Sequence, residues 1–471
     1  MRGPLGVGAA SGPDGTHVAE QHVPPRENVR VLPRRRLLLA VAAAILVATP
    51  AAILAGLCFG NACQRSGPIA TRVPFCSLPP DLRSPIEAGF RDGRSPHILA
   101  VAGPTPVVSS DAGRRWPSIE DPAHTVPLVF AGTGFAPGVE VPDGTRLDAI
   151  APTIAEIIGL RRPHPAVRSG EAISGVASGE TLRLVVLVTW KDVSSEELER
   201  QPHRWPVLRG LIEDGAATMD ATAGSLPTDP PAILTTIGTG ALPSDHGITG
   251  SLVRNDQGAV VPAWSEEAPF SVVAALGDDL DELRDQAPRI GIVGTDPSDR
   301  GLIGGNWYEF RGSREDDDVI IEPDPQHQPV AAAALLASGY GVDAIPDLLA
   351  IGAEGPVRKL DQSLGEIISA AKRASGGSFL IAVTSTGSMG SERSGGFTVA
   401  ELEREVTVTV GHDVIEATAP GGVFLDQDAM TQSGLSDDRV VAALRRVKTA
   451  AGENLFADVF PAIAVTFGRY C

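Results

Sequence analysis

Residues that could bind a ligand or act in catalysis follow short apolar runs in this sequence. Loops after Thr189, Ala223 and Thr384 carry them: Lys191 and Asp192 in the first, Thr228 in the second and Thr386 in the third. A lysine can hold an anion, and a threonine hydroxyl beside carboxylates is a nucleophile that metal ions can activate. The apolar runs read as buried strands, and parallel sheets bind ligands at the carboxyl ends of their strands. These residues are therefore the first candidates for a site.

The apolar runs are rich in branched residues, which predicts buried strands of the parallel-sheet type. They are Ile98–Ala102, Val126–Ala131, Leu184–Thr189, Ile290–Val293 and Phe379–Thr384. Helical patterns lie between them, at Leu147–Gly159, Val207–Glu213, Asp361–Ala374 and Asp437–Ala450. This alternation predicts one α/β domain, a doubly wound and mostly parallel sheet with helices on both faces.

An uncharged apolar segment occupies residues 37–58. Roughly 20 such residues cross a hydrocarbon core. Arg34, Arg35 and Arg36 precede the segment directly, which predicts a cytoplasmic N-terminus and an extracytoplasmic main domain. The same arginines loosely resemble a twin-arginine export signal, so a cleaved segment is the alternative. Either interpretation places the main domain outside the cytoplasm.

Four parts are expected along the chain. They are a disordered cytoplasmic tail (1–36), a transmembrane helix (37–58), a stalk (59–94) and the α/β domain (95–471). The net charge of −19 disfavours nucleic acid as a partner, because phosphate backbones need a positive surface. The four cysteines have no zinc-motif spacing, although they could pair in an oxidising compartment.

Four elements follow one another from Arg183 onward. They are a hydrophobic strand, a proline-led helix ending in Glu213-Asp214-Gly215, a Ser/Thr loop, and a threonine-rich helix before Asp245-His246-Gly247. This order resembles the opening of a phosphodiesterase or nucleotide pyrophosphatase domain of the alkaline phosphatase superfamily. Residues 345–368 and 379–390 resemble the middle of the same domain. The resemblance implies a phosphoric ester hydrolase fold, in which carboxylates and histidines hold two divalent metals such as zinc.

Residues 95–175 resemble the end of that family domain, through HTVPLVFAGTGFAPG and TRLDAIAPTIAEIIGL. They precede residues 182–471, which resemble its beginning and middle. We therefore predict a circular permutation, with the old termini joined near residues 174–181. The alternative is that residues 95–175 are a remnant of a second copy. Permutation would bring the new ends together, which predicts a disulfide between Cys76 and Cys471.

Two catalytic positions of the resemblance carry unexpected residues. The first metal aspartate falls on Lys191, with Asp192 one place later; a shift in register would restore Asp192 as a ligand. The nucleophile falls on Pro230, which has no hydroxyl, while Thr228 lies two residues earlier.

Further metal positions also depart from the family pattern. Glu354 and Arg358 occupy the segment where the family carries D-x-x-x-H, and Thr386 lies in the turn that should carry two ligands. His124 could be a metal ligand or a structural histidine, and His246 matches a structural position of the family. Positive charge at sites meant for carboxylate or imidazole would repel a dication.

The sequence therefore predicts a membrane-anchored, extracytoplasmic, phosphodiesterase-like pseudoenzyme that acts as a binding or scaffold protein without a resident cofactor. An anionic or phosphate-bearing ligand near Lys191 and Arg358 is a candidate partner. The alternative is an active metal-dependent phosphoric ester hydrolase with a rebuilt site. That site would use Thr228 as nucleophile and Asp192, Glu354 and His124 around two zinc ions. No sequence feature points specifically to a third class, a structural envelope protein.

Overall fold

The computed structural model describes residues 74–108, 115–118, 125–136, 138–305, 307–308, 319–387, 396–468 and 471. The predicted tail and membrane segment, residues 1–58, lie outside this range. Within the described residues, no helix combines the length and the apolar character needed to cross a bilayer. Arg72–Cys471 forms one compact unit.

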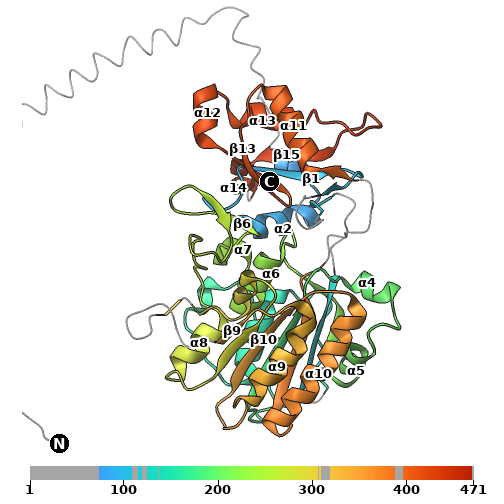
Figure 1. Cartoon of the computed structure of the whole chain (residues 1–471), viewed down its shortest axis with the longest axis vertical. Helices are drawn as coiled ribbons and strands as arrows, with labels where there is room; N and C mark the ends of the chain where they lie inside the picture. The colour runs from blue at the N-terminus through green and yellow to red at the C-terminus, as the bar shows by residue number, and fades with distance from the viewer. Residues whose placement is uncertain are drawn as a thin grey trace, which may run out of the picture. The chain divides into compact units, whose positions relative to one another are not determined.

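The larger sheet of the described residues has seven strands (Figure 1). In spatial order they are β5 (Ala216–Thr222), β3 (Thr125–Gly132), β11 (Phe379–Ser385), β4 (Leu184–Trp190), β10 (Asp347–Ala353), β8 (Ile290–Val293) and β9 (Val319–Ile321). Every strand except β3 runs in one direction. The predicted α/β class with a mostly parallel sheet is therefore confirmed. The expectation that Val126–Ala131 is a parallel strand is wrong, because β3 is antiparallel to both of its neighbours.

Helices cover both faces of this sheet because alternate residues of its central strand are apolar on both sides. Val185 and Leu187 of β4 belong to one core cluster, and Val186 and Val188 belong to another. The first cluster includes residues of α3 (Ile150–Ile157), α6 (Pro230–Thr239) and α8 (Leu276–Leu283). The second includes residues of α5 (Pro206–Asp214), α9 (Gln328–Ala337) and α10 (Val357–Ser375), which lie in front of the sheet in Figure 1.

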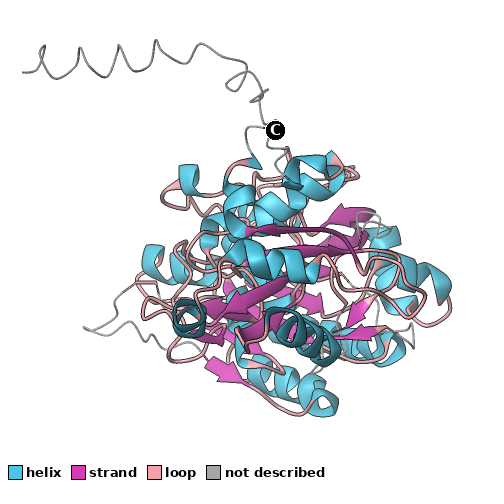
Figure 2. Cartoon of the chain, turned by 90° about the horizontal axis from the view of Figure 1, so that it is seen from above, coloured by secondary structure: helices cyan, strands magenta, loops and turns pink. Residues whose placement is uncertain are grey.

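A second, smaller sheet was not anticipated. It is antiparallel, with the order β13 (Ile415–Ala419), β14 (Gly422–Leu425), β1 (Ile98–Ala102) and β15 (Phe456–Pro461). The expectation that Ile98–Ala102 is a parallel strand is wrong. The run is continuously apolar because this sheet, too, is covered on both faces: Ile98 packs in one cluster and Leu99 in another. Figure 2 shows the strands of the domain as a whole lying among helices.

One face of the smaller sheet packs on α11 (Val399–Val410), α12 (Gln427–Ser433) and α13 (Asp437–Leu444). The other face packs on η1 (Pro74–Ser77), α2 (Pro80–Gly89) and α14 (Ala462–Thr466). The domain therefore begins before residue 95, and the C-terminal part of the predicted stalk belongs to it. The prolines that suggested a stalk instead start α2, since proline is favoured in the first helical turn.

The two ends of the compact unit lie side by side. Cys76 of η1 and Cys471 form a disulfide, with 5.4 Å between their Cα atoms. This is the pair that the permutation predicted, and the separation lies within the usual range for a disulfide.

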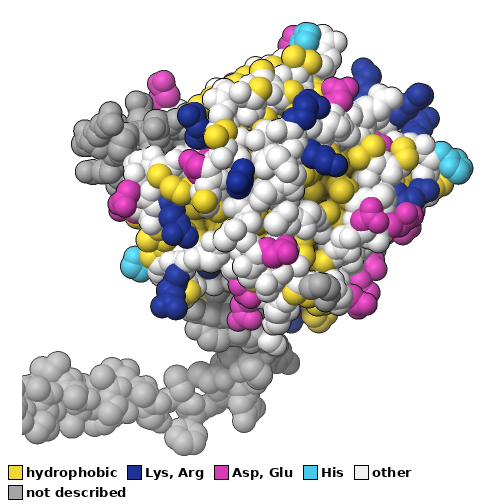
Figure 3. All heavy atoms as spheres, turned by 90° about the horizontal axis from the view of Figure 1, so that it is seen from below, with side chains coloured by type: hydrophobic (Ala, Val, Ile, Leu, Met, Phe, Trp, Pro, Cys, Tyr) yellow, Lys and Arg dark blue, Asp and Glu magenta, His cyan; other side chains and the backbone are white. Residues whose placement is uncertain are grey.

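The remaining elements are short. They are α4 (Ser195–Arg200), α7 (Pro243–His246), the pairs β2 (Val107–Val108) with β12 (Phe397–Thr398) and β6 (Leu252–Arg254) with β7 (Val260–Pro262), and the 3₁₀ helices η2 (Leu147–Ala149), η3 (Pro165–Val167), η4 (Pro297–Leu302) and η5 (Pro325–His327). On the face seen in Figure 3, acidic and basic side chains are interspersed.

Candidate functional site

A buried lysine lies where β4, β8 and β10 end. Lys191 directly follows β4, and its backbone N–H donates to the Ala353 carbonyl at the end of β10, over 2.7 Å. Only 4% of the Lys191 side chain is exposed. An ammonium buried this deeply needs compensating partners, because removing a charge from water is costly.

Asp299 is the principal partner of this ammonium. Its Oδ2 lies 3.0 Å from Lys191 Nζ, and 1% of its side chain is exposed. Lys191 Nζ also donates to the Thr295 hydroxyl over 2.5 Å, and Glu354 Oε2 lies 3.7 Å away. We call Lys191, Thr295, Asp299 and Glu354 the strand-end cluster. With one positive and two negative formal charges, it offers an anion little attraction.

The Asp299 carboxylate is held from several sides. It lies in η4, and its Oδ2 accepts the backbone N–H groups of Thr295 (2.7 Å) and Asp296 (3.2 Å). Burial raises the pKa of Asp299, while Lys191 and these N–H groups oppose the rise. Room for the carboxylate comes from a glycine: a Cβ at Gly352 would lie 2.5 Å from Asp299 Cγ.

Asp192 does not share the surroundings of Lys191. Its side chain is exposed, and its backbone takes a left-handed conformation with φ of 58°. The Asp192 N–H donates to the hydroxyl of Thr386 over 3.0 Å. Thr386 is fully buried, and its own N–H donates to the Trp190 carbonyl. Thr386 therefore ties the end of β11 to the turn after β4.

Thr228 and Arg358 lie outside the strand-end cluster. Thr228 is buried just before α6, and its Oγ1 has no hydrogen-bond partner among the described residues. Arg358 is exposed in the first turn of α10. Of the residues that the sequence singled out, the structure therefore joins Lys191 with Glu354 directly.

The structure describes one of the two histidines that the sequence analysis considered. His124 lies outside the described residues. His246 is fully buried, its Nδ1 accepts the Ile248 N–H, and its Nε2 lies 3.0 Å from Thr236 Oγ1. Because the Thr236 hydroxyl donates to the Ala232 carbonyl, His246 Nε2 carries the proton and donates to Thr236. Burial lowers the pKa of His246 to about 3, so this histidine is neutral and structural.

The residues at the strand ends do not fit a pair of zinc ions. A zinc site needs three or four carboxylate, imidazole or thiolate ligands around one point. Within the described part of the chain, no three such side chains gather around a point that could hold a metal. The Lys191 ammonium contacts the Asp299 carboxylate. Lys191 occupies the sequence position where the resemblance puts a metal-binding aspartate.

Sequence reasoning missed Thr295 and Asp299. Both lie in Thr295-Asp296-Pro297-Ser298-Asp299, directly after the predicted strand Ile290–Val293. This is a capping sequence: Asp296 Oδ1 accepts the Ser298 N–H over 2.8 Å at the start of η4. Attention to the loop after this strand, as well as to the loops after Thr189, Ala223 and Thr384, would have included both residues.

Comparisons with protein-family models and with curated proteins find no match. Among solved structures, the chain is similar to wild-type alkaline phosphatase PafA, with 15% identity over 56% of this chain and 76% of that chain and a TM-score of 0.41. A PafA variant with four substitutions gives 15% identity, the same coverage and a TM-score of 0.39. Phosphonoacetate hydrolase from Sinorhizobium meliloti 1021, in complex with phosphonoacetate, gives 16% identity over 42% of this chain and 56% of that chain, with a TM-score of 0.29.

Proposed function

We propose that this protein is a membrane-anchored, extracytoplasmic domain with an alkaline-phosphatase-like fold that works as a binding or scaffold protein and not as a hydrolase. The observation that carries this proposal is the buried Lys191–Asp299 pair at the ends of the central strands. A lysine at this position supplies a fixed positive charge within the protein. It thereby takes the place of the cation that the resemblance implies.

Electrostatics explains why this lysine and a divalent metal exclude each other. Two unit charges 4 Å apart interact by about 4 kcal/mol at an effective dielectric constant near 20, so a dication and an ammonium repel by about 8 kcal/mol. Asp299 already accepts hydrogen bonds from Lys191 and from two backbone N–H groups. A metal at this point would have to displace the ammonium and forfeit the ion pair.

Metal content and phosphodiesterase activity test this proposal. The full-length protein, purified in detergent and exposed to zinc, should retain no stoichiometric metal and should not hydrolyse bis(p-nitrophenyl) phosphate. The variant Lys191→Asp is the matched comparison, because it would add a carboxylate beside Asp299 and Glu354; it should bind more divalent metal than the wild type. Two zinc equivalents together with hydrolysis by the wild type would contradict the proposal. If Thr228→Ala left that activity intact, the rebuilt-site alternative would fail as well.

We also infer that the chain is a circular permutant. In support, β15 near the C-terminus pairs with β1 along its length, and the Ala462 N–H donates to the His97 carbonyl over 2.8 Å. The Cys76–Cys471 disulfide closes the same end of the unit. If residues 174–181 join old termini, a protease site inserted between Gly175 and Gly179 should be cleaved with the two pieces staying assembled. Loss of cooperative unfolding after cleavage would count against the inference.

The membrane anchor rests on the sequence of residues 37–58 and its arginine flank. The full chain should stay with the membrane fraction after extraction at high pH. A version with residues 37–58 deleted should be found in the soluble fraction. Release by alkaline extraction of a chain shortened by its N-terminal segment would argue instead for a cleaved signal.

A further inference from the structure

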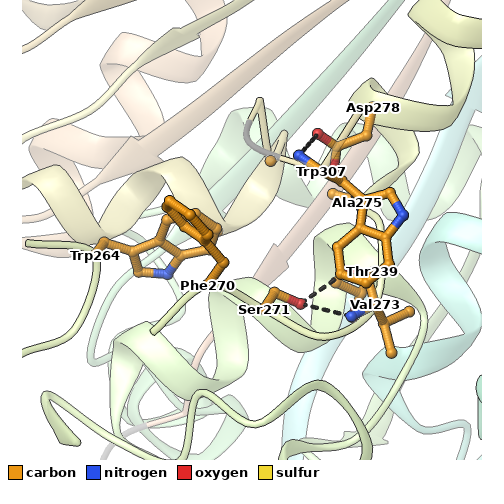
Figure 4. A pocket seen from close by; sticks show the side chains of 10 residues that line it. Thr239, Trp264, Phe270, Ser271, Val273, Ala275, Asp278 and Trp307 are labelled. Carbon is orange, nitrogen blue, oxygen red and sulfur yellow. Dashed lines mark hydrogen bonds between the residues drawn. The ribbon is translucent and has the colours of Figure 1, made fainter. Parts of the chain in front are cut away.

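An open groove lies between the turn that joins β6 to β7 and the loop that joins β7 to α8. Its volume is about 750 Å³, and its lining includes Arg94, Asp256, Phe270 and Trp307. A smaller, partly open cavity of about 10 Å³ shares Phe270, Ser271 and Trp307 with the groove, and it is lined by Trp264 as well (Figure 4). We call the groove, with Phe270 and Trp307 in its lining, the aromatic cleft; Trp264 lines the neighbouring cavity.

Aromatic side chains are scarce in this protein, at 4% of its residues with only five tryptophans. Trp307 and Phe270 nevertheless line this groove, and Trp264 lines the adjoining cavity. Phe270 is 43% exposed, and Trp264 and Trp307 are half-buried. Exposed rings that line a concave surface present their electron-rich faces to a ligand.

Trp264 is held in an unusual backbone conformation. Its φ is 64°, in the left-handed region that bulky residues rarely adopt. The indole N–H donates to Thr235 Oγ1 of α6 over 3.2 Å, which fixes the ring against the core helix. Such local strain persists where the surrounding structure enforces it, and it is common at ligand sites.

The rim of the aromatic cleft carries negative charge. Asp256, Glu266 and Glu267 are exposed and line the groove, and among the described residues that line it Arg94 is the one guanidinium. Arg94 is directed to the backbone: its Nη1 donates to the carbonyls of Gly247 (3.2 Å) and Phe270 (2.9 Å). The formal charge of these four groups is −2, which opposes a phosphate and favours a cation.

We propose that the aromatic cleft binds a small organic cation, an ammonium group that carries alkyl substituents. Rings around a quaternary or alkylated ammonium attract it through their quadrupoles, and nearby carboxylates add charge complementarity. This site shares no residue with the strand-end cluster, so it stands whether or not the protein hydrolyses phosphoric esters. The chemistry fits a free ammonium compound and equally the head group of a choline lipid.

Titration of the full-length protein in detergent with choline and with tetramethylammonium, followed by tryptophan fluorescence and calorimetry, tests the cleft. Both cations should bind, and the neutral analogue of choline with a tert-butyl group in place of trimethylammonium should bind about tenfold more weakly or worse. Phe270→Ala should weaken binding about fivefold or more. Leu283→Ala is the matched control, since Leu283 is 44% exposed and does not line the cleft, and it should bind as the wild type does.

Two further experiments test the role of charge in binding and the source of the cation. Glu266→Gln combined with Glu267→Gln should weaken cation binding and reduce its salt dependence, without affecting the neutral analogue. Phosphatidylcholine vesicles that compete with choline would identify a lipid source, and vesicles that do not compete would identify a free cation. Equal affinity for choline and its neutral analogue would overturn the proposal. So would an unchanged affinity in a folded Phe270→Ala variant, or no binding of either cation at millimolar concentration.

Discussion

The strand-end cluster and the aromatic cleft use polar and charged side chains in opposite ways. At the strand ends, Lys191 is 4% exposed and its ammonium is held by Asp299, Thr295 and Glu354. At the aromatic cleft, Phe270 is 43% exposed and the carboxylates of Glu266 and Glu267 face solvent. In the first region the ammonium is paired within the protein, whereas the second brings a ring and carboxylates to the protein surface. At the carboxyl ends of the parallel strands, the protein therefore supplies its own counter-ion to the buried lysine.

Removing the ammonium from the strand-end cluster should have the largest effect on stability. Lys191→Met keeps most of the side-chain volume but leaves the buried Asp299 carboxylate without its counter-charge. Breaking one side of a buried ion pair costs about 3–5 kcal/mol. Urea unfolding of the full-length protein at pH 8 should show a loss of this size, while Glu354→Gln, at a half-exposed residue, should cost less than about 1 kcal/mol.

The pH dependence of that loss identifies its cause. Burial already raises the pKa of Asp299, and Lys191 opposes the rise, so removing Lys191 should raise this pKa further. As the pH falls, the variant therefore buries a protonated Asp299 more readily than the wild type does, and the cost of Lys191→Met should shrink from pH 8 to pH 5. The same cost at pH 5 and pH 8 would point to lost packing and would remove the distinction drawn between the two regions.

The buried histidine His246 gives a second prediction, on how the free energy of unfolding changes at acidic pH. The histidine pKa in the fold is about 3, against about 6.5 in an unfolded chain. The unfolded state therefore binds a proton first, and stability from this group should fall by about 1.4 kcal/mol per pH unit as the pH drops from about 6.5 toward 3. The slope of unfolding free energy against pH should be smaller in His246→Asn, whose side-chain oxygen could still accept the Ile248 N–H. Identical slopes in the two proteins would mean that His246 is accessible to protons in the fold.

Gly352→Ala probes how tightly the strand-end cluster is packed. The new Cβ would lie 2.5 Å from Asp299 Cγ, and this carboxylate is fixed by backbone N–H groups as well as by Lys191. Overpacking of this kind costs about 1–3 kcal/mol. Gly210→Ala in α5 is the control, since a Cβ there meets nothing within 4 Å. Equal unfolding midpoints for the two variants would show that the carboxylate has room to move.

The sequence predicted four strands of the larger sheet because buried strands leave an apolar signature that needs no knowledge of their partners. β3, β4, β8 and β11 lie where the apolar runs indicated, whereas β5, β9 and β10 were not predicted. The direction of pairing leaves no such signature: β1 is as apolar as a parallel strand because helices cover both its faces. The Cys76–Cys471 pair came from the resemblance and its implied permutation, since spacing alone does not identify partners.

The contacts of Lys191 were less accessible to sequence reasoning. Its substitution for an expected aspartate was visible from the resemblance. Its partner Asp299 lies 108 residues away, in a loop that reads as an ordinary helix cap. The aromatic cleft and the cavity beside it are similar, because Trp264, Phe270 and Trp307 follow no periodicity and meet only through the tertiary fold. Pairings of this kind depend on the packing of α6 and η4, which local patterns do not encode.

The smallest stability effect is expected at the aromatic cleft. Phe270→Ala removes a ring that is 43% exposed, so little apolar surface returns to water and unfolding free energy should change by less than about 1 kcal/mol. Leu283→Ala, at 44% exposure, should behave alike. The two variants should then differ in ligand affinity and not in stability. A loss of several kcal/mol in Phe270→Ala, measured by urea unfolding, would instead show that the ring belongs to the core. The aromatic cleft would then contribute to stability as the strand-end cluster does.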